Sequence, residues 1–264
     1  MVMLLMVTRL TGQVLVKYLY LPPPVTNETN WSKALDFSGS SERAQQVSSG
    51  SSYNPIMMGG NSTTVGGNAI PGRTANNSNA RPWACATVFR VDGHNSNQHI
   101  WNVGEGAGSN DDNIYLRVDS SRRLYFGWGR DGARNELHFS TATANVWYGV
   151  YIGFTGERLS GSNATSTNLS DCFDIRAVDL STGAVGSNLS IPSYWAAGNS
   201  TTGGRMDRSV TGSTTIGGRG SNRSFHGKVA SNVITTLRRN QPMPTTTEIS
   251  MMVRDPIKWM NDYK

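Results

Sequence analysis

The sequence predicts an all-β fold, an antiparallel β-sandwich with an extended N-terminal β-arm and a short C-terminal helix. Charged residues make up only 16% of the 264 residues, while Gly, Ser, Thr and Asn are abundant. That composition is typical of short strands joined by polar loops. Short runs of alternating apolar and polar residues also follow one another closely, separated by turn signals such as Asp92-Gly93 and Ser181-Thr182-Gly183.

The first element is the segment TRLTGQVLVKYLY at residues 8–20, which alternates as a half-buried strand does. One face would carry Leu10, Val14, Val16, Tyr18 and Tyr20. The prolines at 22–24 forbid continuation into the body of a sheet. We therefore expect residues 1–24 to form an arm that docks on another polypeptide. The alternative is that the strand folds back as an edge strand of its own domain.

The main domain is expected to span residues 25–240, beginning near ALDF at 34–37. Its strands are predicted at 83–91, 98–103, 113–118, 123–128, 135–140, 146–154, 172–180, 213–217 and 225–236. Trp83, Trp101, Trp147, Val150 and Ile152 are assigned to the core because they lie inside these strands. Glycines 217 and 218 predict a tight turn, and Gly227 predicts close packing of one backbone against another.

The tail, residues 241–264, has a helical pattern instead. Thr245 to Thr247 with Glu248 form an N-cap signature, and Ile249, Met252 and Val253 fall on one helical face. Pro256 would end or restart the helix, and Trp259 is expected to dock the tail on the domain.

Charge, cysteines and the N-terminus exclude several classes of protein. The net charge is +6, but Lys and Arg are spread along the chain, so we expect no nucleic-acid binding. Cys85 and Cys172 each lie in an apolar-alternating run, which indicates buried small hydrophobic residues. The apolar start MVMLLMV has no basic flank and no cleavage site, so neither export nor a membrane span is expected.

Two segments carry a resemblance to a known superfamily. WYGVYIGFTG at 147–156 is a Trp-led strand ending in a turn glycine, and residues 213–234 contain Ile-Gly-Gly followed by Phe-x-Gly. In these features the chain resembles the concanavalin A-like lectin and glucanase superfamily, within it the laminin G-like and pentraxin-like modules. The resemblance covers about residues 31–240. It implies a jelly-roll sandwich and leaves the function open.

The leading strand carries a second resemblance. Its pattern R-L-T-x-x-V-x-V-x-Y at residues 9–18, followed by proline, is similar to the N-terminal strand of tailed-bacteriophage virion structural proteins. This implies a virion component, either a capsid decoration or a tail-attached protein, assembled in the bacterial cytoplasm. Its expected partners are major capsid or tail proteins, and the protein itself is expected to be a homo-oligomer.

Catalytic motifs are missing from the sequence. Enzymes of this superfamily place carboxylates at alternating positions of one strand, E-x-D-x-x-E, because hydrolysis of a glycosidic bond needs two carboxylates facing one cleft. The six glutamates of this chain are scattered, and no such run occurs. Walker loops, nucleophile elbows and dinucleotide fingerprints are likewise missing. We therefore expect a protein that is not an enzyme.

Two loops contain candidate ligand-binding residues. Tyr194 and Trp195, with Asn199 beside them, could form a platform for a cell-surface glycan; alternatively, they anchor the loop to the core. Asn110, Asp111, Asp112 and Asn113 offer oxygen ligands for Ca²⁺, the one cofactor considered, as calcium sites of laminin G-like modules do. The alternative is a solvated turn whose side chains bond to their own backbone.

These observations favour a non-enzymatic phage virion protein that is anchored by its first strand and presents loops outward. A freestanding carbohydrate-binding lectin module is the alternative, and a glycoside hydrolase is the third reading.

Overall fold

The structure is a computed structural model. The residues that it describes are 4–5, 15–20, 34–38, 44–45, 82–93, 97–104, 113–130, 133–155, 173–189, 193–196, 215–218, 223–237 and 242–262.

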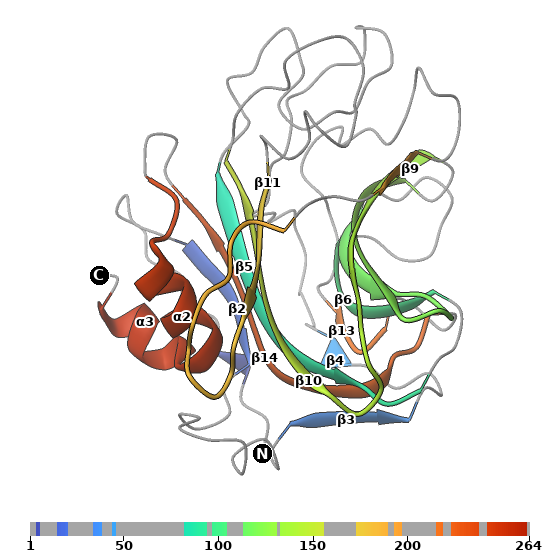
Figure 1. Ribbon diagram of the computed structural model, residues 1–264, viewed down its shortest axis with the longest axis horizontal. Helices are drawn as coiled ribbons and strands as arrows, with labels where there is room; N and C mark the ends of the chain where they lie inside the picture. The colour runs from blue at the N-terminus through green and yellow to red at the C-terminus, as the bar shows by residue number, and fades with distance from the viewer. Residues whose placement is uncertain are drawn as a thin grey trace, which may run out of the picture.

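Two antiparallel sheets face each other and form a jelly-roll β-sandwich (Figure 1). Sheet A has the strand order β1 (Leu4–Leu5), β2 (Leu15–Tyr20), β14 (His226–Thr236), β5 (Trp83–Val91), β10 (Trp147–Phe154) and β11 (Phe173–Val178), and β3 (Leu35–Ser38) also pairs with β14. Sheet B has the order β12 (Ser193–Ala196), β9 (Ala133–Thr141), β8 (Arg123–Arg130), β7 (Asn113–Val118), β6 (Gln98–Gly104), β13 (Thr215–Ile216) and β4 (Ala44–Gln45). The predicted fold class is therefore confirmed.

The strands agree closely with those predicted from alternation. Strands β5 and β7 have the predicted bounds, and β6, β8, β9, β10, β11, β13 and β14 differ from prediction by a few residues at their ends. Strand β12 was not predicted, because the sequence around it reads as a loop. Its four residues pair with β9, which shows how a neighbouring strand can order a segment of weak local preference.

The core lies between the two sheets and is rich in aromatic residues. Trp83 contacts Phe126 and Phe154 with ring centroids 5.5 and 6.2 Å apart, and Phe173 packs against both of those phenylalanines. All four side chains are buried. Trp101 is also buried, as predicted, and its indole N–H donates to the Thr87 hydroxyl at 3.0 Å. Cys85 is a buried hydrophobic residue too, and burial raises the pKa of its thiol to about 12.

Two short strands pair with the outer edge of the long strand β14. Strand β3 pairs with the first part of β14, from His226 to Val229, and β2 pairs with the last part, from Asn232 to Thr236. Strand β1 adds to β2 in turn. Residues 15–20 therefore pair within their own chain, and the expectation of a strand whose partner lies in another polypeptide is wrong for them. The physical reason is that the outer edge of β14 offers unpaired backbone groups to a nearby strand.

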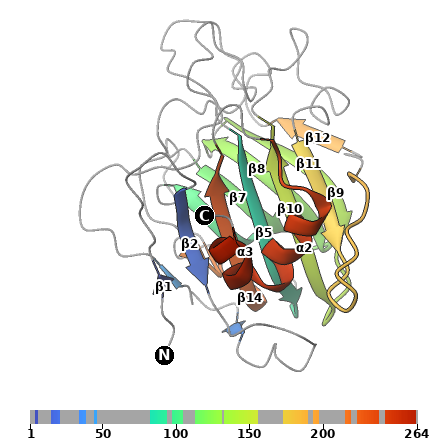
Figure 2. The same cartoon turned by 90° about the vertical axis from the view of Figure 1, so that its left-hand side faces the viewer.

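Two helices cover the face of sheet A that points away from sheet B (Figures 1 and 2). Helix α2 (Thr246–Arg254) begins with the predicted capping box of Thr245 and Glu248, and helix α3 (Pro256–Asp262) restarts at the predicted proline. Their buried side chains, Ile249, Met252, Val253 and Trp259, pack with Ala84, Ala86, Val88, Tyr151, Ala230 and Val233 of sheet A. Burial of each large apolar side chain contributes about 1.5–3 kcal/mol to docking.

The turn after β13 depends on a glycine, as the sequence predicts. Gly217 has φ +85°, and a Cβ there would collide with the ring of Phe37. A larger residue would therefore disrupt both the turn and the packing of β3.

Candidate functional site

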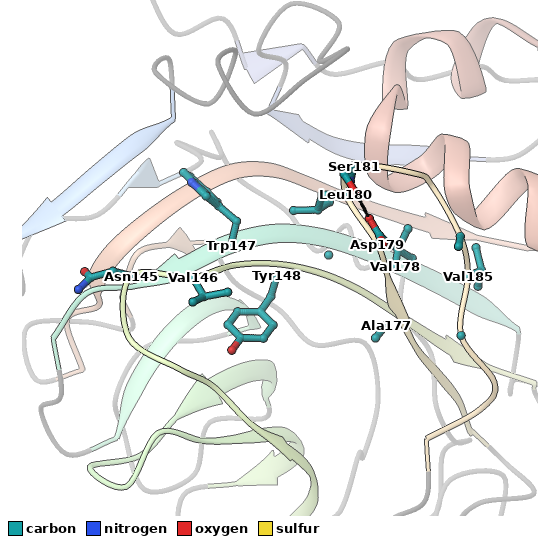
Figure 3. Close-up of a pocket in the computed structure, with 13 residues that line it drawn as sticks. Asn145, Val146, Trp147, Tyr148, Ala177, Val178, Asp179, Leu180, Ser181 and Val185 are labelled. Atoms are coloured by element: carbon teal, nitrogen blue, oxygen red, sulfur yellow. Dashed lines mark hydrogen bonds between the residues drawn. The ribbon is translucent and has the colours of Figure 1, made fainter.

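A pocket opens at the edge of sheet A because β10 continues past the end of β11. The last pair between these strands is Gly149 with Val178, whereas β10 begins two residues earlier, at Trp147. The chain turns after Val178 and returns along β11, where the Gly186 N–H donates to the Ala177 carbonyl oxygen at 2.9 Å. A notch of about 770 Å³ lies between residues 145–149 and 177–186 (Figure 3). This volume is within the range of small-molecule sites in proteins.

Trp147 and Tyr148 line the pocket and point to opposite sides of β10 (Figure 3). The Tyr148 ring stacks on Phe89, with centroids 5.9 Å apart, and its hydroxyl accepts a hydrogen bond of 2.6 Å from the backbone N–H of Thr143. Trp147 is half-buried on the face that carries the helices. Its assignment to the core together with Val150 and Ile152 was wrong. Side chains alternate between the two faces of a strand, so the odd-numbered position 147 lies on the opposite face from the even-numbered positions 150 and 152.

The opposite wall of the pocket is the turn that follows β11. Asp179 Oδ1 accepts hydrogen bonds from the backbone N–H groups of Ser181 and Thr182 at 2.8 and 3.0 Å, and from the Ser181 hydroxyl at 2.7 Å. These bonds lower the pKa of Asp179 to about 2. Arg254 of α2 donates to the Ser181 carbonyl oxygen at 3.3 Å. The turn thus presents a carboxylate that is ionised at neutral pH and held by three hydrogen bonds.

Beside the pocket, four residues lie directly opposite one another across four strands: Trp147 of β10, Arg90 of β5, Lys228 of β14 and Asp36 of β3. The guanidinium carbon of Arg90 is 5.7 Å from the centroid of the Trp147 ring. Arg90 also donates to both carboxylate oxygens of Asp92, at 2.5 and 2.8 Å, and Lys228 pairs with Asp36. The hydrogen bond to Asp92 raises the pKa of Arg90. We call these residues, together with the pocket, the Trp147 site.

A second group of polar and aromatic side chains lies on the face of sheet B that points away from the core; we call it the Arg117 layer. Tyr115 of β7 reaches across Gly127 of β8, and its hydroxyl donates to Glu136 of β9 at 2.7 Å. A Cβ at Gly127 would collide with the Tyr115 ring. Arg117 lies over the ring of Tyr125, 4.1 Å from its centroid, and donates to both Glu136 oxygens at 2.7 and 2.5 Å.

The Arg117 layer is almost fully buried, with side-chain exposures of 6% for Arg117 and 1% for Glu136. Burial by itself would lower the pKa of Arg117, but the hydrogen bonds and charge of Glu136 outweigh it, and the pKa is raised. Arg117 and Glu136 can both stay ionised while buried because two parallel hydrogen bonds join them and each charge neutralises the other. We interpret this layer as a structural ion pair, and the exposed Trp147 site as the candidate ligand site.

The residues predicted to bind a glycan are only partly described. Tyr194 and Trp195 belong to strand β12 and not to a loop, which corrects the sequence interpretation, and Asn199 lies outside the described residues. The register places Trp195 opposite Glu136. The sequence reasoning missed the Trp147 site, although the parity of Trp147 within its strand was a usable signal.

None of the other predicted site residues that the structure describes lines the pocket of the Trp147 site. Val16, Tyr18 and Tyr20 lie in β2, while Leu10 and Val14 are outside the described residues. Asn113 begins β7, and the rest of the predicted calcium loop, Asn110, Asp111 and Asp112, is not described either. Among the residues that are described, no group of three or more His, Cys, Asp or Glu side chains could hold a metal ion. No described helix has the length and apolarity needed to span a membrane.

Comparison with known proteins gives structural likeness at low identity. No family model and no curated protein matches the chain. Among solved structures, the CBM40 of the Ruminococcus gnavus IT-sialidase bound to α2,3-sialyllactose shares 12% identity, with 66% of this chain and 83% of that chain covered and a TM-score of 0.40. A Trypanosoma rangeli sialidase shares 14% identity over 93% of this chain but 30% of its own length, with a TM-score of 0.45.

A SAP-like pentraxin from Limulus polyphemus shares 14% identity, with 66% of this chain and 70% of that chain covered and a TM-score of 0.33. With identities and TM-scores this low, the function of this chain has to be inferred from its own residues.

Proposed function

We propose that this protein is a non-catalytic carbohydrate-binding module whose ligand site is the Trp147 site. The supporting observation is a half-buried tryptophan that lines a pocket of about 770 Å³ together with amide, carboxylate and hydroxyl groups from Asn145, Asp179 and Ser181. A sugar ring has an apolar face that stacks on an aromatic ring and hydroxyls that hydrogen-bond to planar polar groups, so this combination suits it.

The chemistry of the pocket supports binding without hydrolysis. Cleavage of a glycosidic bond commonly needs two carboxyl groups on either side of the bond. Among the described residues that line the pocket, Asp179 is the only one with a carboxylate. The low pKa of Asp179 also makes it a poor proton donor at neutral pH. The pocket can therefore hold a sugar but lacks an acid and base pair among these residues.

The experiment is a glycan array followed by calorimetry with the strongest hits. Trp147→Ala should weaken binding at least tenfold, because it removes the stacking surface, whereas Trp147→Phe should retain part of the affinity. Tyr194→Ala provides the comparison with the site predicted from sequence. If Trp147→Ala binds the hits as tightly as the wild type, the ligand lies elsewhere and the proposed site is wrong.

A place in a phage virion stays a prediction, and so do the expected homo-oligomer, the calcium site and the location in the bacterial cytoplasm during assembly. The virion prediction depends on the sequence pattern of residues 9–18. Pairing of residues 15–20 with β14 makes this strand part of the domain. Mass spectrometry of purified phage particles would detect the protein if it is a virion component.

A further inference from the structure

We propose that the Trp147 site selects neutral oligosaccharides and discriminates against carboxylated and sulfated ones. This inference rests on the proposed function and adds the ligand class. It follows from one ionised carboxylate, Asp179, at the pocket wall, and from two neighbouring cations, Arg90 and Lys228, that are already paired with carboxylates.

The charge inside the pocket is negative. Asp179 is ionised throughout the physiological pH range, since its pKa is about 2. The described lining residues include no Lys or Arg. A carboxylate or sulfate that entered this pocket would approach Asp179 with no lining cation among those residues to offset the repulsion.

The two cations of the Trp147 site, Arg90 and Lys228, are each paired with a carboxylate. Arg90 is held by Asp92 through two hydrogen bonds, and Lys228 by Asp36. Because Arg90 and Lys228 lie directly opposite each other in the sheet, these carboxylates also relieve the repulsion between them. Arg254 donates to the Ser181 carbonyl oxygen at 3.3 Å and is not among the described residues that line the pocket.

A neutral sugar can donate a hydroxyl hydrogen bond to the Asp179 carboxylate. Three hydrogen bonds from Ser181 and Thr182 end on Oδ1 of Asp179. Because Asp179 is exposed, its carboxylate can also accept from a sugar hydroxyl, a bond that is strengthened because the acceptor is charged. A neutral ligand gains this bond without the repulsion that an anionic ligand would meet.

The first test is Asp179→Asn, which keeps an oxygen that can accept from Ser181 and Thr182, removes the charge and replaces the second carboxylate oxygen by an amide donor. Binding would be measured by calorimetry with lactose and 3′-sialyllactose, and with further array hits paired with their sulfated or uronate-containing counterparts. The wild type should prefer the neutral member of each pair, and Asp179→Asn should reduce that preference about threefold to tenfold.

The second test removes the carboxylate partners of Arg90 and Lys228. Asp92→Asn releases Arg90 and Asp36→Asn releases Lys228, so each variant should bind acidic glycans more tightly, about threefold, and the gain should shrink at high salt. Asp174→Asn is the matched control, because it removes a carboxylate from another ion pair of sheet A, with Arg176, outside the pocket. This control changes the net charge equally and should leave selectivity unchanged.

The outcomes separate the two proposals. Trp147-dependent binding that is equal or tighter for acidic members overturns the selectivity and leaves the proposed function in place. Selectivity that Asp179→Asn and Asp174→Asn alter equally also overturns it, because net charge alone would then account for the change. Binding of no glycan, or binding that Trp147→Ala leaves intact, overturns the proposed function and this inference with it.

Discussion

The Trp147 site and the Arg117 layer contain the same kinds of side chain but differ in exposure. Each combines aromatic rings with an arginine and a carboxylate. In the Arg117 layer the arginine and its carboxylate are only 6% and 1% exposed, whereas Arg90 and Asp92 of the Trp147 site are 26% and 17% exposed. Residue types alone therefore do not distinguish a ligand site from a structural ion pair, because water access decides which groups can exchange one partner for another.

The largest effect on stability is expected from Glu136→Gln. Removing this charge leaves Arg117 buried without its counterion and should lower the free energy of unfolding by about 3–5 kcal/mol. Urea denaturation monitored by tryptophan fluorescence would measure the change. Asp92→Asn, which breaks the partly exposed pair, should cost about 1 kcal/mol or less. Equal losses for the two variants would contradict the distinction between the sites.

Gly127→Ala should have the next largest effect, about 1–3 kcal/mol, because the added methyl collides with the Tyr115 ring. The measurement is again urea denaturation, now as a double-mutant cycle with Tyr115→Ala. In the Tyr115→Ala background the alanine at 127 should cost clearly less. Additive effects would show that the collision is not what requires the glycine.

Trp147→Ala should reduce glycan affinity more than stability, which is the opposite of what is expected for Glu136→Gln in the Arg117 layer. Because Trp147 is half-buried, its truncation should cost only about 1–2 kcal/mol of stability, while glycan affinity falls at least tenfold as proposed above. Thermal unfolding and calorimetry on the same preparation give the two numbers. Glu136→Gln, measured at a temperature at which the variant is folded, should leave glycan affinity unchanged.

The smallest effect concerns pH and the turn that carries Asp179. The folded-state pKa of about 2 lies below the ordinary value of 3.8, so the carboxylate contributes stability that is present above about pH 4 and is lost as the pH falls through about 2. Comparison of thermal unfolding at pH 2 to 6 with that of Asp179→Asn would reveal the contribution. Wild type and variant should differ at pH 5, and most of this difference should be lost by pH 2.

Local signals in the sequence were sufficient for most of the fold. Alternation located β5 and β7 with correct bounds, and the capping box marked the start of α2. Strand β12 was missed because its pairing with β9 overrides a loop-like sequence. The pairing of β2 was misjudged because a strand sequence reveals that it needs a partner but not which edge supplies it.

By itself, the sequence determined the class of the fold and the hydrophobic face of most strands, because a period of two and the turn residues are local properties of the chain. Only the tertiary structure decided which residues lie opposite one another. Trp147, Arg90, Lys228 and Asp36 come from four strands, and their register depends on sheet pairing over long sequence separations. The pocket beside them exists because two neighbouring strands end at different heights, which is a property of the assembled sheet.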